Sequence, residues 1–165
     1  TLMNERAALG SGTGLSWRDI IKLADQTPSW AGSVMEDPAF HEWLADYYVN
    51  TEAIRLMSFR TLTSLSKGEA PGPESAAGKL LWSNKTQEMT SEALDILDHF
   101  GVLDGAEDAS FSGAFQHRFL WSPGLRLGGG TDEIMKNIIA ERVLGLPPDI
   151  RVDKTVPFRE IPHGR

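Results

Sequence analysis

Apolar side chains recur every three or four residues along two long stretches of the chain, which is the spacing that places them on one face of an α-helix. The first stretch begins at Asp37-Pro38, a capping residue followed by the residue favoured at the first helical position, and continues to about residue 67. At 1.5 Å per residue this helix is about 45 Å long, which is typical of a helical bundle. The second stretch runs from 74 to about 100 and ends at Gly101, and a turn rich in proline and glycine at 69–73 joins the two.

Shorter helical patterns precede this pair. Residues 2–10 have the pattern of the end of a helix, which the glycine- and serine-containing segment at 10–14 stops. Ser16 is the predicted cap of a helix over 17–26, and a loop with Pro and Gly follows at 27–32.

The C-terminal part of the chain is less regular until its last helix. Residues 104–130 lack a helical period, so we expect an irregular crossing with a short helix near 114–120. A final helix is predicted over 131–144, with Thr131 as its cap and Gly145 as its stop. Its expected apolar face consists of Ile134, Met135, Ile138, Ile139, Val143 and Leu144.

Three glycines at 128–130 lead directly into this last helix. Glycines let a ligand approach the backbone, and the N–H groups at the start of a helix suit an electron-rich or anionic group. Asp132 and Glu133 place negative charge in the first turn, where the helix dipole is positive. The pattern alone leaves two alternatives, a ligand site and a plain loop.

Together these elements predict an all-α fold, an antiparallel, four-helix-type up-and-down bundle. We expect the bundle to occupy residues 1–146 and an extended tail to occupy 147–165. The sequence has no internal repeat and no alternating strand pattern. A chain of 165 residues is long enough to bury a core as one domain.

Composition narrows the class of protein. The net charge of −7, without a Lys/Arg stripe, argues against nucleic-acid binding. The absence of cysteine excludes disulfide and thiolate chemistry and fits a reducing compartment, so we expect a cytoplasmic location. No apolar run of about 18 residues and no basic-then-apolar start is present, so we expect no membrane span and no signal peptide. The first residue is Thr, which leads us to expect a processed chain or a fragment.

The sequence contains little that would support a metal site or a hydrolytic active site. A di-iron bundle needs Glu-x-x-His pairs on inward faces, and only Glu160 and His163 have that spacing, with Pro162 between them breaking any helix. The other histidines have no partners at ligand spacing, and no Ser-His-Asp elbow or phosphate loop is present. We therefore predict no metal site.

The stretch GGGTDEIMKNIIAERVLGLP, residues 128–147, resembles the last helix of the acyl-CoA dehydrogenase family, in which a Gly-Thr-Ser-x-Ile segment lies against the flavin. The resemblance extends from the first six residues to the tail at 152–159, which is similar to that of many actinobacterial members. It implies the C-terminal helical-bundle domain of an FAD-dependent oxidoreductase of fatty acid and lipid metabolism. Such enzymes oxidise an acyl-CoA across Cα–Cβ: a carboxylate removes the α-proton and hydride passes to N5 of FAD.

The resemblance also implies where the catalytic base lies. In many members the base is a Glu just before the Gly-Thr pair, a position occupied here by Gly129. A second branch carries its glutamate on an earlier helix in a Leu-Glu-Arg context, which Asn4-Glu5-Arg6 matches. The resemblance therefore implies Glu5 as the base, with Met3, Asn4 and Arg6 lining the acyl-CoA site. The alternative for Glu5 is a solvated helix residue beside Arg6.

Cofactor contacts carry over at the last helix. Gly130 matches the glycine that lies beside the thioester. The residues that match the family's flavin contacts are Thr131, Asp132 and Glu133.

Two family segments that serve the flavin of a neighbouring subunit are altered. The Arg-x-x-Phe segment reads Thr-Pro-Ser-Trp at 27–30, and the Gln-x-x-Gly-Gly segment has Asp95 and Asp98, whose charges would repel a diphosphate. We therefore hypothesise a heterotetramer with a paralogous acyl-CoA dehydrogenase subunit in place of a self-assembled oligomer. The resemblance further implies electron-transfer flavoprotein as the acceptor, and bulky branched or sterol side-chain thioesters as one class of substrate.

The family also has an N-terminal helical domain and a middle β domain, which hold most of the FAD and CoA and are not in this sequence. We expect this chain alone to be inactive. The alternative is a non-catalytic helical-bundle subunit or assembly domain.

Overall fold

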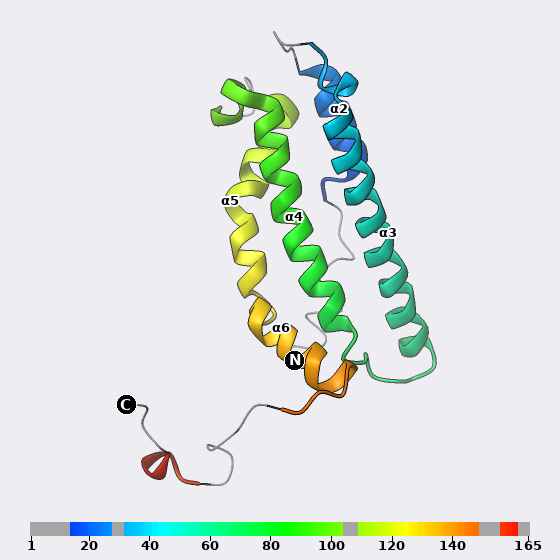
Figure 1. Cartoon of the computed structure of the whole chain (residues 1–165), viewed down its shortest axis with the longest axis vertical. Coiled ribbons are helices and arrows are strands. Elements are labelled where there is room, and N and C mark those ends of the chain that lie inside the picture. Colours follow the sequence, from blue (N-terminus) through cyan, green and yellow to red (C-terminus); the bar gives the residue numbers. More distant parts are fainter. Residues whose placement is uncertain (1–13, 28–31, 104–108, 149–155, 162–165) are drawn as a thin grey trace.

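A computed structural model describes residues 14–27, 32–103, 109–148 and 156–161. In these ranges the chain is helical and contains no strand, so the predicted all-α fold is confirmed. The helices α2 (Trp17–Gln26), α3 (Pro38–Ser66), α4 (Ser75–Leu97) and α5 (Ala114–Leu127) run alternately up and down, as Figure 1 shows. Helix α6 (Asp132–Ile138) follows at the lower end of this antiparallel bundle.

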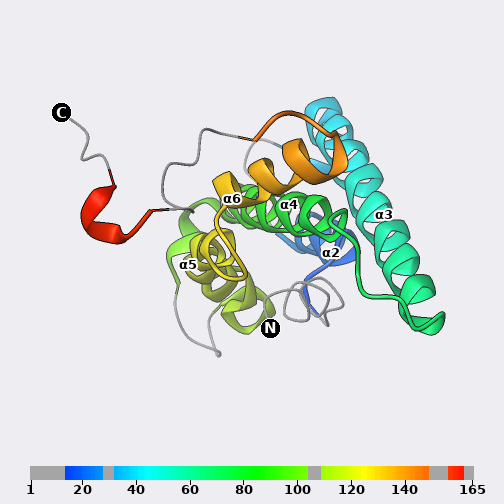
Figure 2. The same cartoon turned by 90° about the horizontal axis from the view of Figure 1, so that it is seen from below.

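Helix α4 lies at the centre of the bundle. It packs against α2, α3, α5 and α6, and the view from below in Figure 2 shows these helices around it. Short 3₁₀ turns cover Val34–Glu36, Asp98–Val102, Ser110–Gly113 and Phe158–Glu160. No helix in the described ranges is both long and apolar enough to span a membrane.

The predicted ranges of α2 and α3 are confirmed, and capping residues define the start of both helices. Ser16 and Asp19 form a capping box at the start of α2, in which the Ser16 backbone N–H donates to the Asp19 carboxylate over 2.9 Å. The Asp37 carboxylate accepts from the Ala39 N–H over 2.8 Å, with Pro38 at the first helical position of α3. Gly68 follows the end of α3 in the left-handed conformation, with φ 77°.

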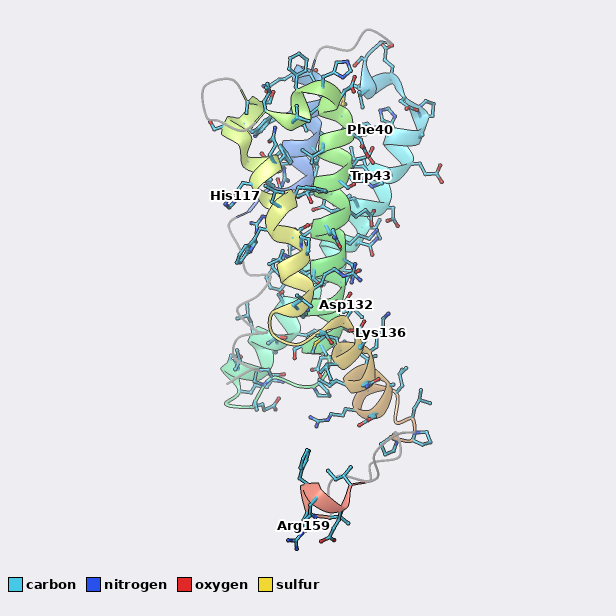
Figure 3. All side chains as sticks on the ribbon, turned by 90° about the vertical axis from the view of Figure 1, so that its left-hand side faces the viewer. Phe40, Trp43, His117, Asp132, Lys136 and Arg159 are labelled. Carbon is cyan, nitrogen blue, oxygen red and sulfur yellow. The ribbon has the colours of Figure 1, made fainter. Side chains whose placement is uncertain are left out.

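The apolar core occupies one end of the bundle, which Phe40 and Trp43 mark in Figure 3. Its buried members are Ile20, Leu23, Ala24, Phe40, Tyr47, Met89, Ala93, Ile96, Leu97 and Phe115. The Tyr47 hydroxyl donates to Met89 Sδ over 3.0 Å, and burial, with a smaller contribution from Glu88, raises the pKa of Tyr47 to about 12.

The predicted irregular crossing at 104–130 is wrong in its second half. Helix α5 continues past the expected end near residue 120 to Leu127, through Pro123. Proline has no N–H for the carbonyl of Phe119, four residues earlier, and the buried Ser122 hydroxyl donates to that carbonyl instead, over 2.9 Å. The side chain thus compensates for the missing backbone hydrogen bond.

The last helix begins as predicted but ends differently. The Thr131 side chain caps it, whereas α6 widens into a π-helical turn at Ile139–Val143, in which the Leu144 N–H donates to the Ile139 carbonyl over 2.9 Å. The extra residue in this turn rotates the side chains that follow it, and the predicted apolar face does not pack as one surface even before the turn. Met135 is buried, but Ile134 is 47% exposed and Leu144 is 65% exposed.

The end of α4 also differs from expectation, and the buried face of the helix changes in character along its length. The helix stops at Leu97, because Asp98 adopts a positive φ of 50°. Its second half buries Met89, Ala93, Ile96 and Leu97, whereas its first half buries Lys79, Ser83 and Thr86 beside Ala76. The bundle therefore has an apolar end and a polar end.

Candidate functional site

The predicted site lies partly within the described residues. Met3, Asn4, Glu5 and Arg6 fall outside them, so their assignments stay predictions. The remaining predicted residues, 130–133, form the connection between α5 and α6 at the polar end of the bundle, where Figure 3 shows Asp132.

A turn at 128–130 connects α5 to α6. Gly129 and Gly130 have φ values of 68° and 111°, which L side chains rarely adopt, so glycine is required at both positions. The Gly128 N–H donates to the Gly124 carbonyl and the Gly130 N–H to the Leu127 carbonyl, over 2.9 and 3.3 Å. Because no side chain projects from the turn, a planar group can approach its backbone closely.

Thr131 and Glu133 interact with each other at the start of α6. The Thr131 hydroxyl oxygen accepts from the Ile134 N–H over 3.4 Å. Hydrogen bonds from the Glu133 backbone N–H and from the Thr131 hydroxyl lower the pKa of the exposed Glu133 carboxyl. Glu133 therefore presents an ionised carboxylate next to the turn.

Asp132 points in the opposite direction, into the bundle, and is 5% exposed. Arg126, in the last turn of α5, donates to Asp132 Oδ2 from Nε over 2.7 Å and from Nη2 over 2.6 Å. Arg126 also donates to Gln87 Oε1 over 3.0 Å, and Asn84 donates to Asp132 Oδ2 over 3.4 Å. The carboxylate thus joins the start of α6 to α5 and α4.

Lys79 of α4 completes this polar network and is 1% exposed. Its ammonium donates to the carbonyl of Gly130 over 2.8 Å and to that of Arg126 over 3.3 Å, and lies 4.0 Å from Asp132 Oδ1. Sequence reasoning missed Lys79, because lysine is counted as a solvent-facing residue. The available signal was its spacing, since 76, 79, 83, 86 and 90 follow one face of α4 and are all buried.

The turn carries no side chain that would keep a flavin edge from its backbone, and the side chains that follow it are engaged within the chain. Asp132 is bound within the bundle, and Thr131 and Glu133 are bound to each other and to the backbone of α6. The backbone around Gly130 and Thr131 is therefore the part of the predicted cofactor site that suits such a group. The assignments of Asp132 and Glu133 as cofactor contacts stay predictions.

The altered positions that the sequence analysis assigned to a neighbour's flavin lie elsewhere. Asp95 and Asp98 are exposed at the far end of α4 from Lys79, about 25 Å along the helix at 1.5 Å per residue. Within the segment 27–30, only Thr27 is described, and its hydroxyl donates to the Leu23 carbonyl over 2.7 Å.

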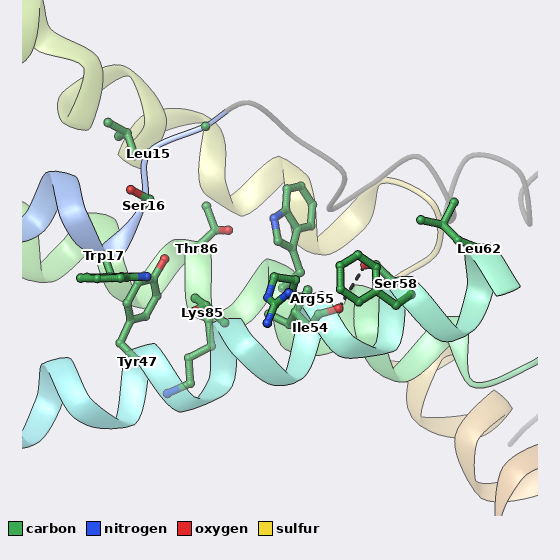
Figure 4. Close-up of a pocket in the computed structure, with 14 residues that line it drawn as sticks. Leu15, Ser16, Trp17, Tyr47, Ile54, Arg55, Ser58, Leu62, Lys85 and Thr86 are labelled. Carbon is green, nitrogen blue, oxygen red and sulfur yellow. Dashed lines mark hydrogen bonds between the residues drawn. The ribbon is translucent and has the colours of Figure 1, made fainter.

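A cavity of about 470 Å³ lies between α3, α4 and the start of α2, away from the glycine turn. Figure 4 shows Trp17, Tyr47, Ile54 and Leu62 along it. Its two cations are matched by neighbouring carboxylates: Arg55 pairs with Glu52 over 2.6 Å, and Lys85 pairs with Asp46 and Glu88 over 2.7 and 2.9 Å. The cavity is accordingly suited to apolar groups.

No three side chains of Asp, Glu, His or Cys gather at metal-binding distances in the ranges that the structure describes. His163, which has the Glu-x-x-His spacing to Glu160, lies outside those ranges.

Comparison with known proteins identifies relatives of this architecture. Residues 1–144 match the family described as acyl-CoA dehydrogenase, C-terminal domain. The chain is 32% identical over 133 residues to acyl-CoA dehydrogenase IpdE1 of Mycolicibacterium smegmatis, covering 81% of this chain and 31% of that protein. It is 27% identical over 149 residues to acyl-CoA dehydrogenase FadE34 of Mycobacterium tuberculosis, covering 89% of this chain and 19% of that protein.

Solved structures share the fold. The Tcur3481-Tcur3483 steroid ACAD superposes with a TM-score of 0.73 at 24% identity, covering 90% of this chain and 38% of that chain. The ChsE4-ChsE5 complex from Mycobacterium tuberculosis superposes with a TM-score of 0.68 at 22% identity, covering 79% of this chain and 34% of that chain. The chain spans about a third or less of the length of the curated relatives described above.

Proposed function

This chain belongs to the acyl-CoA dehydrogenase family, and from that premise we propose that it is the C-terminal bundle of an enzyme that introduces a Cα=Cβ double bond into an acyl-CoA thioester. The observation that carries the proposal is the turn of three glycines at 128–130, which places no side chain where the resemblance puts flavin and thioester. FAD, when bound, supplies the acceptor for the β-hydride.

The residues of this chain have distinct roles in the proposed reaction. The Glu5 carboxylate takes the α-proton as the α C–H bond breaks, and the electron pair of that bond enters the new double bond as the β-hydride departs. A dry pocket raises the basicity of such a carboxylate toward the working pH. Met3, Asn4 and Arg6 line the acyl-CoA site, and Gly130 and Thr131 meet the thioester and cofactor through their backbone. In this proposal the side chain of Asp132 supports α6 from within.

The cofactor and the assembly need more than this chain. The aligned residues make up 31% and 19% of two relatives, so we assign most of the FAD and CoA contacts to other parts of the protein, and we expect these 165 residues alone to be inactive. The names of two structural neighbours describe paired subunits, and one describes a steroid ACAD. We accordingly propose a paralogous partner subunit, a bulky acyl-CoA as substrate and electron-transfer flavoprotein as acceptor.

A second function is favoured by one observation. Large apolar side chains remain exposed on α3 and from α5 to the end of the π turn, as expected of a bundle that serves mainly in assembly. In this alternative the chain is a non-catalytic subunit or assembly domain, and Glu5 has no role in turnover.

Glu5→Gln in the full-length gene product distinguishes the two functions. Glutamine keeps the shape of the side chain but cannot accept the α-proton, so we expect acyl-CoA-dependent reduction of an artificial electron acceptor to fall by about 10³-fold or more. The flavin absorbance band of the purified enzyme should stay unchanged. Glu69→Gln, in the exposed turn between α3 and α4, is the matched control.

Two results would contradict the catalytic proposal. Equal turnover in Glu5→Gln and in the wild type would exclude Glu5 as the base. A full-length product without flavin and without acyl-CoA oxidation would favour the assembly function.

A further inference from the structure

We propose that Lys79 is a positioning residue, whose ammonium holds the two ends of the glycine turn and thereby fixes the backbone that faces the reacting groups. The Lys79 ammonium donates to the carbonyls of Gly130 and Arg126, over 2.8 and 3.3 Å. Arg126 precedes the turn and Gly130 is its last residue, so one side chain from α4 bonds to both ends of the turn.

The distances show that Lys79 lies closer to the backbone of the turn than to the carboxylate of Asp132. Arg126 already makes two bonds to Asp132, over 2.7 and 2.6 Å, whereas the Lys79 ammonium is 4.0 Å from that carboxylate. The ammonium is 1.2 Å closer to the Gly130 carbonyl oxygen than to Asp132 Oδ1. Lys79 therefore acts mainly on the backbone of the turn.

A fixed carbonyl matters because Gly130 and Thr131 share one peptide plane. A charged donor on the Gly130 carbonyl polarises that plane, and hydrogen bonds in series strengthen one another by roughly 10–30%. The same bond stops rotation of the plane, which glycine at φ 111° would otherwise permit. Lys79 thus sets both the direction and the donor strength of the Thr131 N–H.

The inference rests on the proposed function for its consequence, because only a reacting group at Gly130 makes the orientation of this plane matter for turnover. A catalytic misplacement of about 1 Å costs on the order of 10²-fold in rate. Loss of Lys79 should therefore act on kcat more than on KM.

The test uses Lys79→Met in the full-length gene product, because methionine keeps the length and burial of the side chain without its charge. Hydrogen exchange of the turn and the start of α6 should become about ten-fold faster, while that of α2 and α3 stays unchanged. The kcat should fall by about 10- to 100-fold with KM within about three-fold. Lys85→Met, which removes a lysine of α4 that pairs with Asp46 and Glu88, is the matched control.

A cation added from solution tests the role of the charge. In Lys79→Ala, propylammonium should restore slow exchange at the turn and part of the kcat, whereas neutral 1-propanol of the same length should restore neither. Unchanged exchange at the turn in Lys79→Met, equal rescue by both additives, or loss of the whole fold in Lys79→Met would each overturn the positioning role. The exchange measurement needs no substrate, so inactive wild-type protein would overturn the proposed function alone.

Discussion

At the scale of single residues, Glu92 carries an electrostatic penalty in the last two turns of α4. Partial burial is the main cause of its raised pKa, and Asp95, Glu88 and Asp37 add to it. A carboxyl whose pKa is higher in the folded than in the unfolded chain stabilises the fold when protonated, at low pH. That contribution is lost as the pH rises through the folded pKa, so at neutral pH ionised Glu92 opposes folding.

Glu92→Gln should therefore raise stability at pH 7 and have little effect well below its ordinary pKa of 4.5, where both side chains are neutral. The group is only partly buried, so the expected gain at pH 7 is below about 1 kcal/mol. Thermal unfolding of the wild type and the variant between pH 3.5 and 8 measures it. A melting temperature raised equally at every pH, or raised as much by Glu42→Gln on the exposed face of α3, would refute the electrostatic cause.

Residues whose role depends on near neighbours were predictable, and Lys79 was not. Asp37 and Thr131 cap helices through contacts two and three residues away, so their sequence context contains the information. Lys79 is buried by contacts to Arg126 and Gly130, 47 and 51 residues further on. Hydrophobic periodicity contains no information on such partners, and it counts a lysine as exposed.

At the scale of elements, α5 shows how a helix tolerates an internal proline. Pro123 lies four residues from the end of a 14-residue helix, and the Ser122 hydroxyl supplies the donor that proline lacks. The preceding residue therefore decides whether the helix continues to Arg126, which binds Asp132.

Ser122→Ala should destabilise the protein by about 1 kcal/mol, because the carbonyl of Phe119 loses its donor. In a Pro123→Ala background the new N–H supplies that donor, so the same substitution should cost little. A double-mutant cycle by chemical denaturation measures the coupling. Equal losses in both backgrounds would show that the hydroxyl does not compensate for the proline.

Helix lengths could be predicted where apolar period and caps agree. Helix α3 meets both conditions and was predicted to within one or two residues. The π turn at Ile139–Val143 was not, since one extra residue leaves the apolar composition unchanged and alters only the hydrogen-bond partners. Helix α5 was predicted too short because residues 104–130 show no clear helical period.

At the scale of the whole molecule, two sets of large apolar side chains face outward. The α3 surface consists of Tyr48, Val49, Leu56, Phe59 and Leu62, each at least 43% exposed. The α5–α6 surface consists of Leu120, Trp121, Leu127, Ile134 and Leu144, each at least 47% exposed. Exposed apolar patches mark interaction sites, which agrees with the proposal that further protein covers this bundle.

Leu56→Asp should weaken that covering, because it places a charge where we expect an apolar contact. In the full-length product we expect dissociation of the assembly to become at least about ten-fold more favourable, measured by light scattering after gel filtration. Ser91→Asp introduces the same charge at an exposed position of α4 and should leave the assembly intact. An unchanged mass for Leu56→Asp would exclude the α3 surface from the contact between subunits.

The separation of the bundle into an apolar end and a polar end has a consequence for how the protein can change over time. The apolar cluster and the Lys79 network share no residue, so each stabilises its own end of the bundle nearly independently of the other. Mutations that change the glycine turn leave the apolar core intact, and the turn can open briefly while the opposite end stays folded. Residues around the turn can therefore change during evolution while the fold is kept.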